Sequence, residues 1–146
     1  MPDSRATAQW EGNLANGKGS VNSGTGTFGP IPVSWTARTQ QAVSATTPEE
    51  MLAAAQASCY CMALSHELTQ KGHAPSRLNA SAVVTFGPQE GGGWAVTTSK
   101  ITVQGVVPGI DQKAFSEAAE AAAKGCPVSR ALAGVKISLE SAVLES

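Results

Sequence analysis

The chain has 146 residues, enough for one domain with its own hydrophobic core, and we expect residues 1–146 to form a single domain. Apolar residues make up 42% of the chain and charged residues 14%, which argues against a disordered protein. The formal net charge of −1 gives no electrostatic footprint for binding nucleic acid or a membrane surface.

The sequence also bears on the compartment. No stretch approaches the ~18 to 20 apolar residues that a membrane span needs. The first ten residues, MPDSRATAQW, lack the apolar run of a signal peptide. Three cysteines cannot all pair within one chain, and small secreted scaffolds are usually denser in cysteine. We therefore expect a cytoplasmic protein whose thiols are mostly reduced.

The N-terminal part of the chain is expected to form short strands separated by glycine-rich turns. The candidate strands are residues 7–10, 19–22 and 31–37. The stretch SGTGTFGP between the last two is a turn region.

A long helix follows, and its start is well marked in TTPEEML. Thr47 fits the N-cap, Pro48 the first helical position, and Glu50 completes a capping box. The helix is expected to run to about Lys71, with Gly72 in the left-handed position that ends it. Apolar residues cover nearly all of its faces, which is typical of a buried helix.

The remainder of the chain alternates between strands and helices. Residues 80–86 and 94–106 are expected to form a hairpin. Asp111 caps an alanine-rich helix, and Pro127 opens a third, short helix. Residues 135–145 alternate as a half-buried strand does. The order of these elements predicts an α+β fold without internal repeats.

The cysteines of the long helix do not point to the same side. Cys59 and Cys61 lie ~200° apart around a helix, so they cannot readily form a disulfide or bind one metal ion together. His66 lies ~10 Å from Cys59 along the axis, too far for a Cys–His nucleophile pair. A zinc site and a cysteine protease are therefore weakly supported, and Cys61 is best read as a core residue.

Cys126 and Cys59 differ in what favours their thiolates. Cys126 precedes Pro127 at a helix start, where unpaired N–H groups favour a thiolate, although such a position can also be incidental. Cys59 in mid-helix would be only ~3% thiolate at neutral pH, so as a nucleophile it would need a cation. Arg38, at the end of the 31–37 strand, is a candidate; the alternative is a solvated charge at a strand end.

Several motifs together resemble the OsmC/Ohr family of thiol peroxidases, and the OsmC branch (osmotically inducible protein C-like) more than the Ohr branch. They are WEG and GKGSV near the N-terminus, TPEEMLAAAQASCYCMALS in the long helix, VPGID, and AAAKGCPVSRAL near the C-terminus. The likeness covers nearly the whole chain, and the combination of motifs is specific.

The resemblance implies a peroxidase that reduces organic hydroperoxides and, less efficiently, hydrogen peroxide. It places the peroxidatic cysteine at Cys59 and the resolving cysteine at Cys126, with Arg38 and Glu49 completing the catalytic site. It also implies an intertwined α+β homodimer with antiparallel sheets packed around a buried central helix. The resemblance further implies that no cofactor or metal is bound and that the reductant is an external dithiol such as a lipoyl protein.

Helix geometry adds an expectation about assembly. Glu49 and Cys59 are ten residues apart, so they are separated by ~15 Å along one helix. A site that contains both is easier to build when the carboxylate comes from a second subunit. We therefore expect composite sites in an obligate homodimer.

Two other functions remain compatible with these residues. One is a thiol-based redox sensor, which would share the chemistry of sulfur oxidation but would not turn over. The other is a dimeric binding module whose cysteines are structural.

Overall fold

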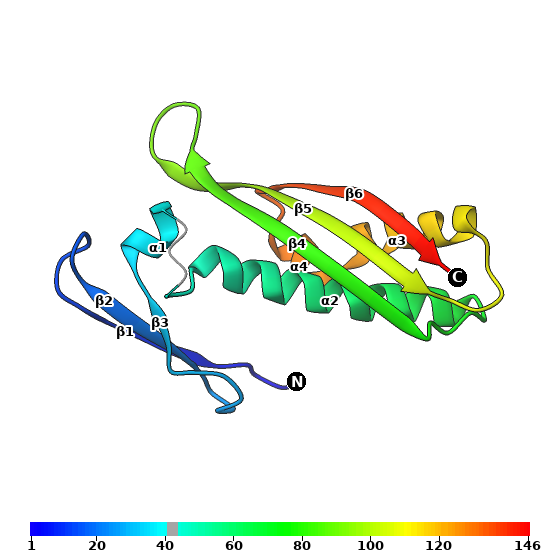
Figure 1. Ribbon diagram of the computed structural model, residues 1–146, viewed down its shortest axis with the longest axis horizontal. Helices are drawn as coiled ribbons and strands as arrows, with labels where there is room; N and C mark the ends of the chain where they lie inside the picture. The colour runs from blue at the N-terminus through cyan, green and yellow to red at the C-terminus, as the bar shows by residue number, and fades with distance from the viewer. Residues whose placement is uncertain (41–43) are drawn as a thin grey trace. The chain divides into compact units, whose positions relative to one another are not determined.

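The computed structural model describes residues 1–40 and 44–146 and has an α+β fold (Figure 1). The chain divides into two compact units, Met1–Met51 and Leu52–Ser146. The long helix α2 (Pro48–Gln70) begins in the first unit and continues through the second.

The first unit contains a three-stranded antiparallel sheet of order β1-β2-β3. Its strands are β1 (Ala6–Glu11), β2 (Lys18–Ser23) and β3 (Ile31–Val33). Only Val21 of these strands is buried, and every residue of β1 is exposed. The strands predicted at residues 7–10 and 19–22 are confirmed, but the sheet has almost no core of its own.

The strand predicted at residues 31–37 is wrong in its second half. Strand β3 ends at Val33, and helix α1 (Trp35–Gln40) follows. The Ser34 hydroxyl accepts a hydrogen bond from the Ala37 N–H at 3.0 Å, so Ser34 caps the helix. Arg38 therefore lies in the last turn of α1 and not at the end of a strand.

The predicted ends of α2 are confirmed. The Thr47 hydroxyl accepts from the Glu50 N–H at 3.0 Å, as an N-cap does. The capping box is incomplete, because the Glu50 carboxylate accepts from the Thr46 hydroxyl instead of turning back to the Thr47 N–H. At the other end, Gly72 has a φ of 84°, which few residues other than glycine adopt readily.

In the single chain α2 is buried along one side only. The buried stripe has a spacing of four residues and consists of Gln56, Tyr60, Leu64 and Leu68. The opposite side carries small and apolar residues that are exposed, including Met62, whose exposed fraction is 67%. An exposed methionine in a stripe of alanine and serine is unusual for a free surface and typical of one that meets a partner.

The second unit is built on a sheet of order β4-β5-β6. The hairpin strands β4 (Arg77–Pro88) and β5 (Trp94–Val106) are antiparallel, while β5 and β6 (Lys136–Glu145) are parallel. A parallel pair needs a crossover connection, which is supplied by α3 (Gln112–Gly125) and α4 (Pro127–Ala131). Figure 1 shows α2, α3 and α4 behind this sheet.

The core of the second unit lies between α2, β5 and α3. Its buried side chains come mainly from all three elements: Tyr60, Leu64 and Leu68 of α2, Ile101 and Val103 of β5, and Phe115 and three alanines of α3. As predicted, Asp111 caps α3, because its carboxylate accepts from the Ala114 N–H at 2.8 Å. The Tyr60 hydroxyl donates to the Ala119 carbonyl oxygen at 2.9 Å, which ties α2 to α3.

A bulge in β6 sets which side chains of the last strand face the core. Leu139 pairs with Ile101 but Ser141 pairs with Thr102, so Glu140 is an extra residue. A one-residue shift exchanges the two faces of a strand. The residues packed on the core are therefore Ile137 and Leu139 before the bulge, and Ala142 and Leu144 after it.

We predict that Gly105→Ala destabilises the protein, because a Cβ atom there would lie 2.7 Å from the Phe115 ring and 2.9 Å from Leu78. Overpacking of this kind costs about 1–3 kcal/mol of unfolding free energy. Gly87→Ala is the matched control, since it also lies in a strand but a Cβ there would meet nothing within 4 Å. Urea unfolding of both variants tests this, and equal stabilities would contradict the packing described.

Candidate active site

The structure brings two of the predicted catalytic residues together. Cys59 lies in the middle of α2, and Cys126 lies between α3 and α4. The two thiols are close enough to interact by hydrogen bonding, and both are free. Cys126 has an exposed fraction of 0%, whereas Cys59 is half-buried. A reagent from solution therefore reaches Cys59 more easily than Cys126.

The surroundings of Cys126 favour its thiolate. Burial by itself would raise the pKa of Cys126, but four hydrogen-bonding groups outweigh it and lower the pKa. These groups are the N–H and the hydroxyl of Ser129, the Cys59 thiol and the N–H of Val128. The helix-start environment predicted for Cys126 is thus present at α4.

Cys59 is in the opposite situation. Burial raises the pKa of Cys59, the N–H of Val128 lowers it partly, and the neighbouring Cys126 raises it again. Once the pair has lost one proton, the negative charge is therefore more favourable on Cys126 and the remaining proton on Cys59. A peroxidatic role for Cys59 therefore requires a positive charge that these surroundings do not contribute.

Cys61 has different neighbours from Cys59, as helix geometry predicts. Burial raises the pKa of Cys61, and the backbone of Ala80 on β4 offsets this partly. Cys61 is thus a half-buried thiol that faces the sheet and points away from the Cys59–Cys126 contact.

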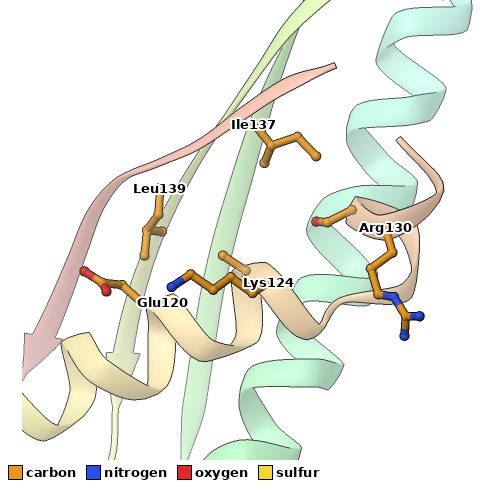
Figure 2. Close-up of a pocket in the computed structure, with 7 residues that line it drawn as sticks. Glu120, Lys124, Arg130, Ile137 and Leu139 are labelled. Carbon is orange, nitrogen blue, oxygen red and sulfur yellow. The ribbon is translucent and has the colours of Figure 1, made fainter. Parts of the chain in front are cut away.

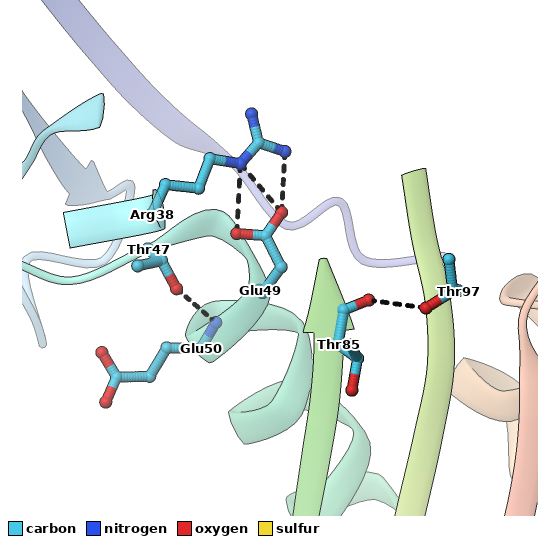
Figure 3. A network of polar contacts seen from close by, with 6 residues as sticks. All are labelled: Arg38, Thr47, Glu49, Glu50, Thr85 and Thr97. Atoms are coloured by element: carbon cyan, nitrogen blue, oxygen red, sulfur yellow. Dashed lines mark hydrogen bonds and ion pairs between the residues drawn. The ribbon is translucent and has the colours of Figure 1, made fainter. Parts of the chain in front are cut away.

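The other two predicted residues also form a pair, and it lies within the first unit (Figure 3). The guanidinium of Arg38 donates from Nε to both carboxylate oxygens of Glu49, at 3.0 and 3.2 Å, and from a terminal nitrogen to Oε1 at 2.7 Å. Glu49 has an exposed fraction of only 5%. A partly buried, forked ion pair fixes the orientation of the guanidinium.

Three polar residues near the thiols were not predicted from the sequence. Ser129, Gln56 and Ser99 are buried and joined by hydrogen bonds. Two signals could have indicated the first two. Ser129 follows Cys126 by three residues, one helical turn, and Gln56 interrupts an alanine-rich run three residues before Cys59. Ser99 has no comparable signal, because its partner is 43 residues away.

A cavity of about 430 Å³ lies near this site, between α3, α4 and β6 (Figure 2). Its lining combines apolar side chains with three charged ones and consists of Glu120, Ala123, Lys124, Ser129, Arg130, Ile137 and Leu139. Neither Cys59 nor Cys126 is among these residues. The cavity is therefore adjacent to the thiol pair without being the place where the thiols react.

Two further observations concern the described residues, 1–40 and 44–146. None of the helices there combines the length and the apolar character needed to cross a membrane. No group of three or more His, Cys, Asp or Glu side chains in the same ranges is arranged to hold a metal ion.

Comparison with known proteins gives consistent matches. A family model described as OsmC-like protein matches residues 40–140. Peroxiredoxin OsmC of Escherichia coli (strain K12) is 34% identical over 128 residues, which are 88% of this chain and 88% of that protein. Its name agrees with the cysteine-based peroxidase expected from the sequence.

Solved structures support the fold. An organic hydroperoxide resistance protein from Elizabethkingia anophelis aligns with a TM-score of 0.78, at 22% identity, over 99% of this chain and 98% of that chain. The organic hydroperoxide resistance protein OhrB of Bacillus subtilis aligns with a TM-score of 0.71, at 23% identity, over 97% and 98% of the two chains. The family-model match and the 34% identity across most of the chain show that the protein belongs to the OsmC-like family.

Proposed function

We propose that the protein is a thiol-dependent peroxidase that reduces organic hydroperoxides and, less efficiently, hydrogen peroxide. Cys59 is the peroxidatic cysteine and Cys126 the resolving cysteine. The observation that carries this proposal is the contact between two free thiols, of which one is half-buried and the other fully buried. The similarity to a protein named peroxiredoxin and to hydroperoxide resistance proteins supports the same reaction here.

The chemistry follows from this contact. The Cys59 thiolate attacks one peroxide oxygen, the O–O bond breaks, and the other oxygen leaves as an alcohol after taking a proton. Cys59 is then a sulfenic acid. The Cys126 thiolate attacks that sulfur, the S–S bond forms, and hydroxide leaves and is protonated to water. An external dithiol, such as a lipoyl protein, reduces the disulfide and restores both thiols.

Arg38 supplies the positive charge that Cys59 needs in this mechanism. A guanidinium beside the sulfur stabilises the thiolate and the charge that develops on the leaving oxygen. Glu49 holds this guanidinium through the forked ion pair. The apolar residues packed around Cys59 favour an alkyl chain over a small polar peroxide.

We place the Arg38–Glu49 pair beside the cysteines of a second subunit, in an obligate homodimer. Helix α2 is continuous from Pro48 to Gln70, so Cys59 follows Glu49 by ten positions, ~15 Å along the helix axis. The exposed stripe of α2 around Met62 and the exposed Trp10 and Phe28 of the first unit fit burial in such an assembly.

Turnover distinguishes this function from its rivals. An enzyme consumes an organic hydroperoxide continuously when dihydrolipoamide is supplied, whereas a redox sensor reacts once and does not turn over with any dithiol. A binding module with structural cysteines leaves all three thiols unchanged after peroxide treatment. A cytoplasmic location fits the first two, because both need a reduced resting state.

Oxidation by one equivalent of organic hydroperoxide is predicted to produce a Cys59–Cys126 disulfide that excludes Cys61. Mass mapping of the oxidised protein identifies the linked peptides. Cys59→Ser should abolish peroxide consumption, whereas Cys126→Ser should react once and then stall or over-oxidise. A Cys59–Cys61 link, or no link at all, would contradict the mechanism.

Replacing Arg38 with Met should raise the pKa of Cys59 and slow peroxide attack by ~100-fold, the size typical of losing one charge-stabilising donor. Thiol alkylation against pH measures the first effect and stopped-flow kinetics the second. Arg77→Met is the matched control, because Arg77 also pairs with a glutamate, Glu145, at 2.9 Å but on an exposed surface. Equal rates in the two variants would mean that another cation serves Cys59.

Subunit mixing tests the composite site. A heterodimer of Cys59→Ser and Glu49→Gln chains should contain one intact site and about half the activity of the wild-type dimer. Since Arg38 and Glu49 pair within one chain, Arg38→Met chains should also complement Cys59→Ser but not Glu49→Gln. The proposal fails if verified heterodimers show no recovery, or if a monomer is fully active.

A further inference from the structure

A chain of buried hydrogen bonds runs from strand β5 toward the resolving cysteine. The Ser99 hydroxyl on β5 donates to Oε1 of Gln56 on α2, and Nε2 of Gln56 donates to the hydroxyl oxygen of Ser129 on α4 at 3.2 Å. Gln56 and Ser99 have exposed fractions of 0%, and Ser129 of 6%. Three elements far apart in the sequence thus contribute polar groups to one place in the core.

The placement of the Gln56 amide, with Oε1 at Ser99 and Nε2 at Ser129, sets the direction of these bonds. An amide nitrogen can only donate, so the Ser129 oxygen is the acceptor in its bond with Gln56. The single proton of the Ser129 hydroxyl then remains for another acceptor. That acceptor is the sulfur of Cys126, with which the Ser129 hydroxyl interacts. All donors of the chain therefore point from β5 toward the sulfur.

Ser129 has an alternative that this arrangement suppresses. A serine inside a helix often turns its hydroxyl back to the carbonyl oxygen one turn earlier. A proton used in this way is lost to the sulfur. The Gln56 amide fixes the position of the Ser129 oxygen from the side of α2, and Ser99 fixes the amide from the side of β5.

Polar groups in a core need a reason, because burying them costs free energy unless they are bonded. Leucine or methionine at position 56 would extend the apolar stripe of Tyr60, Leu64 and Leu68 without this cost. The proposed peroxide chemistry uses none of Gln56, Ser99 or Ser129. Their one connection to that chemistry is the sulfur of Cys126.

We propose that Gln56 and Ser99 are positioning residues for the resolving thiol, and that through Ser129 they keep the negative charge of the cysteine pair on Cys126. This role rests on the proposed function, in which Cys126 attacks the sulfenic acid of Cys59. The chain of bonds prepares the second step of the reaction, because the attacking group must be a thiolate. It does not assist the first step, for which Arg38 is required.

Other titratable groups around Cys126 come from α2. They are Cys59, and Tyr60, whose hydroxyl is already used as a donor to the Ala119 carbonyl oxygen. Replacing Cys59 with Ser removes the first of these without touching the serine–glutamine chain. The double variant Cys59→Ser/Cys61→Ser leaves Cys126 as the only thiol, so the ultraviolet absorbance of its thiolate can be followed against pH without any reagent.

In this background, Ser129→Ala should raise the pKa of Cys126 by about one unit, the effect of losing one hydrogen bond to the charged form. Gln56→Met should shift it in the same direction, and Ser99→Ala by a smaller amount. Ser129→Thr keeps the hydroxyl and should restore the original pKa. Gln112→Met is the matched control. Gln112 also forms hydrogen bonds with a serine and with the backbone, but it lies at the opposite end of α3 from Cys126.

The second measurement uses chains that retain all three cysteines. At a pH well below the pKa of Cys126, a one-unit rise in that pKa lowers the thiolate fraction about tenfold, and the greater nucleophilicity of the more basic thiolate recovers about threefold. Disulfide formation should therefore become about threefold slower, seen as a longer-lived Cys59 sulfenic acid. Peroxide attack on Cys59 should not slow in the same variants.

The outcomes separate the two proposals. The positioning role is overturned if the pKa of Cys126 in Gln56→Met and Ser99→Ala equals that in the control Gln112→Met. This holds whatever the effect of Ser129→Ala. Thermal unfolding of each variant shows whether it is folded, and Ser99→Ala removes only one oxygen. Shifts in the single-thiol titration with no reaction of the wild type with peroxide would support the positioning role and contradict the peroxidase function.

Discussion

The contact between the thiols of Cys59 and Cys126 is the feature on which the rest of the site depends. Two neighbouring thiols do not readily both become thiolates, because like charges at contact repel strongly. Every group around the pair therefore decides where the one charge lies. The N–H groups of α4 and the Ser129 hydroxyl favour Cys126, and burial opposes the charge at Cys59.

The fold provides this contact through its parallel strand pair. Because β6 runs parallel to β5, the chain must cross over between them, and the crossover contains the junction of α3 and α4. That junction holds Cys126 against the middle of α2. Close packing of α3 on β5, where the Phe115 ring lies over Gly105, keeps the junction in place.

The sequence predicted features with local causes and missed those with distant ones. The start of α2 follows from the Thr47 side chain, which caps the first turn, and its end follows from the backbone conformation of Gly72. The Ser34 cap is equally local, but the alternating residues after Ile31 favoured a strand. The hydrogen bond between Gln56 and Ser129 joins residues 73 positions apart, and no pattern along the chain indicates it. The prediction that Arg38 and Glu49 belong to one site rested on the family resemblance and not on residue spacing.

The Arg38–Glu49 pair has no net charge, and this limits how it can act on Cys59. At ~15 Å the guanidinium and the carboxylate nearly cancel, and salt screens what remains. At contact the balance differs: a unit charge 4 Å from a thiolate contributes about 4 kcal/mol at a protein surface, while the carboxylate behind it contributes less. An arginine that is paired with a carboxylate therefore stabilises a thiolate only at short range. In the proposed mechanism, the reactivity of Cys59 with peroxide then depends on an interface that brings the guanidinium to the sulfur. Activity would accordingly be a property of the assembled dimer rather than of the folded chain.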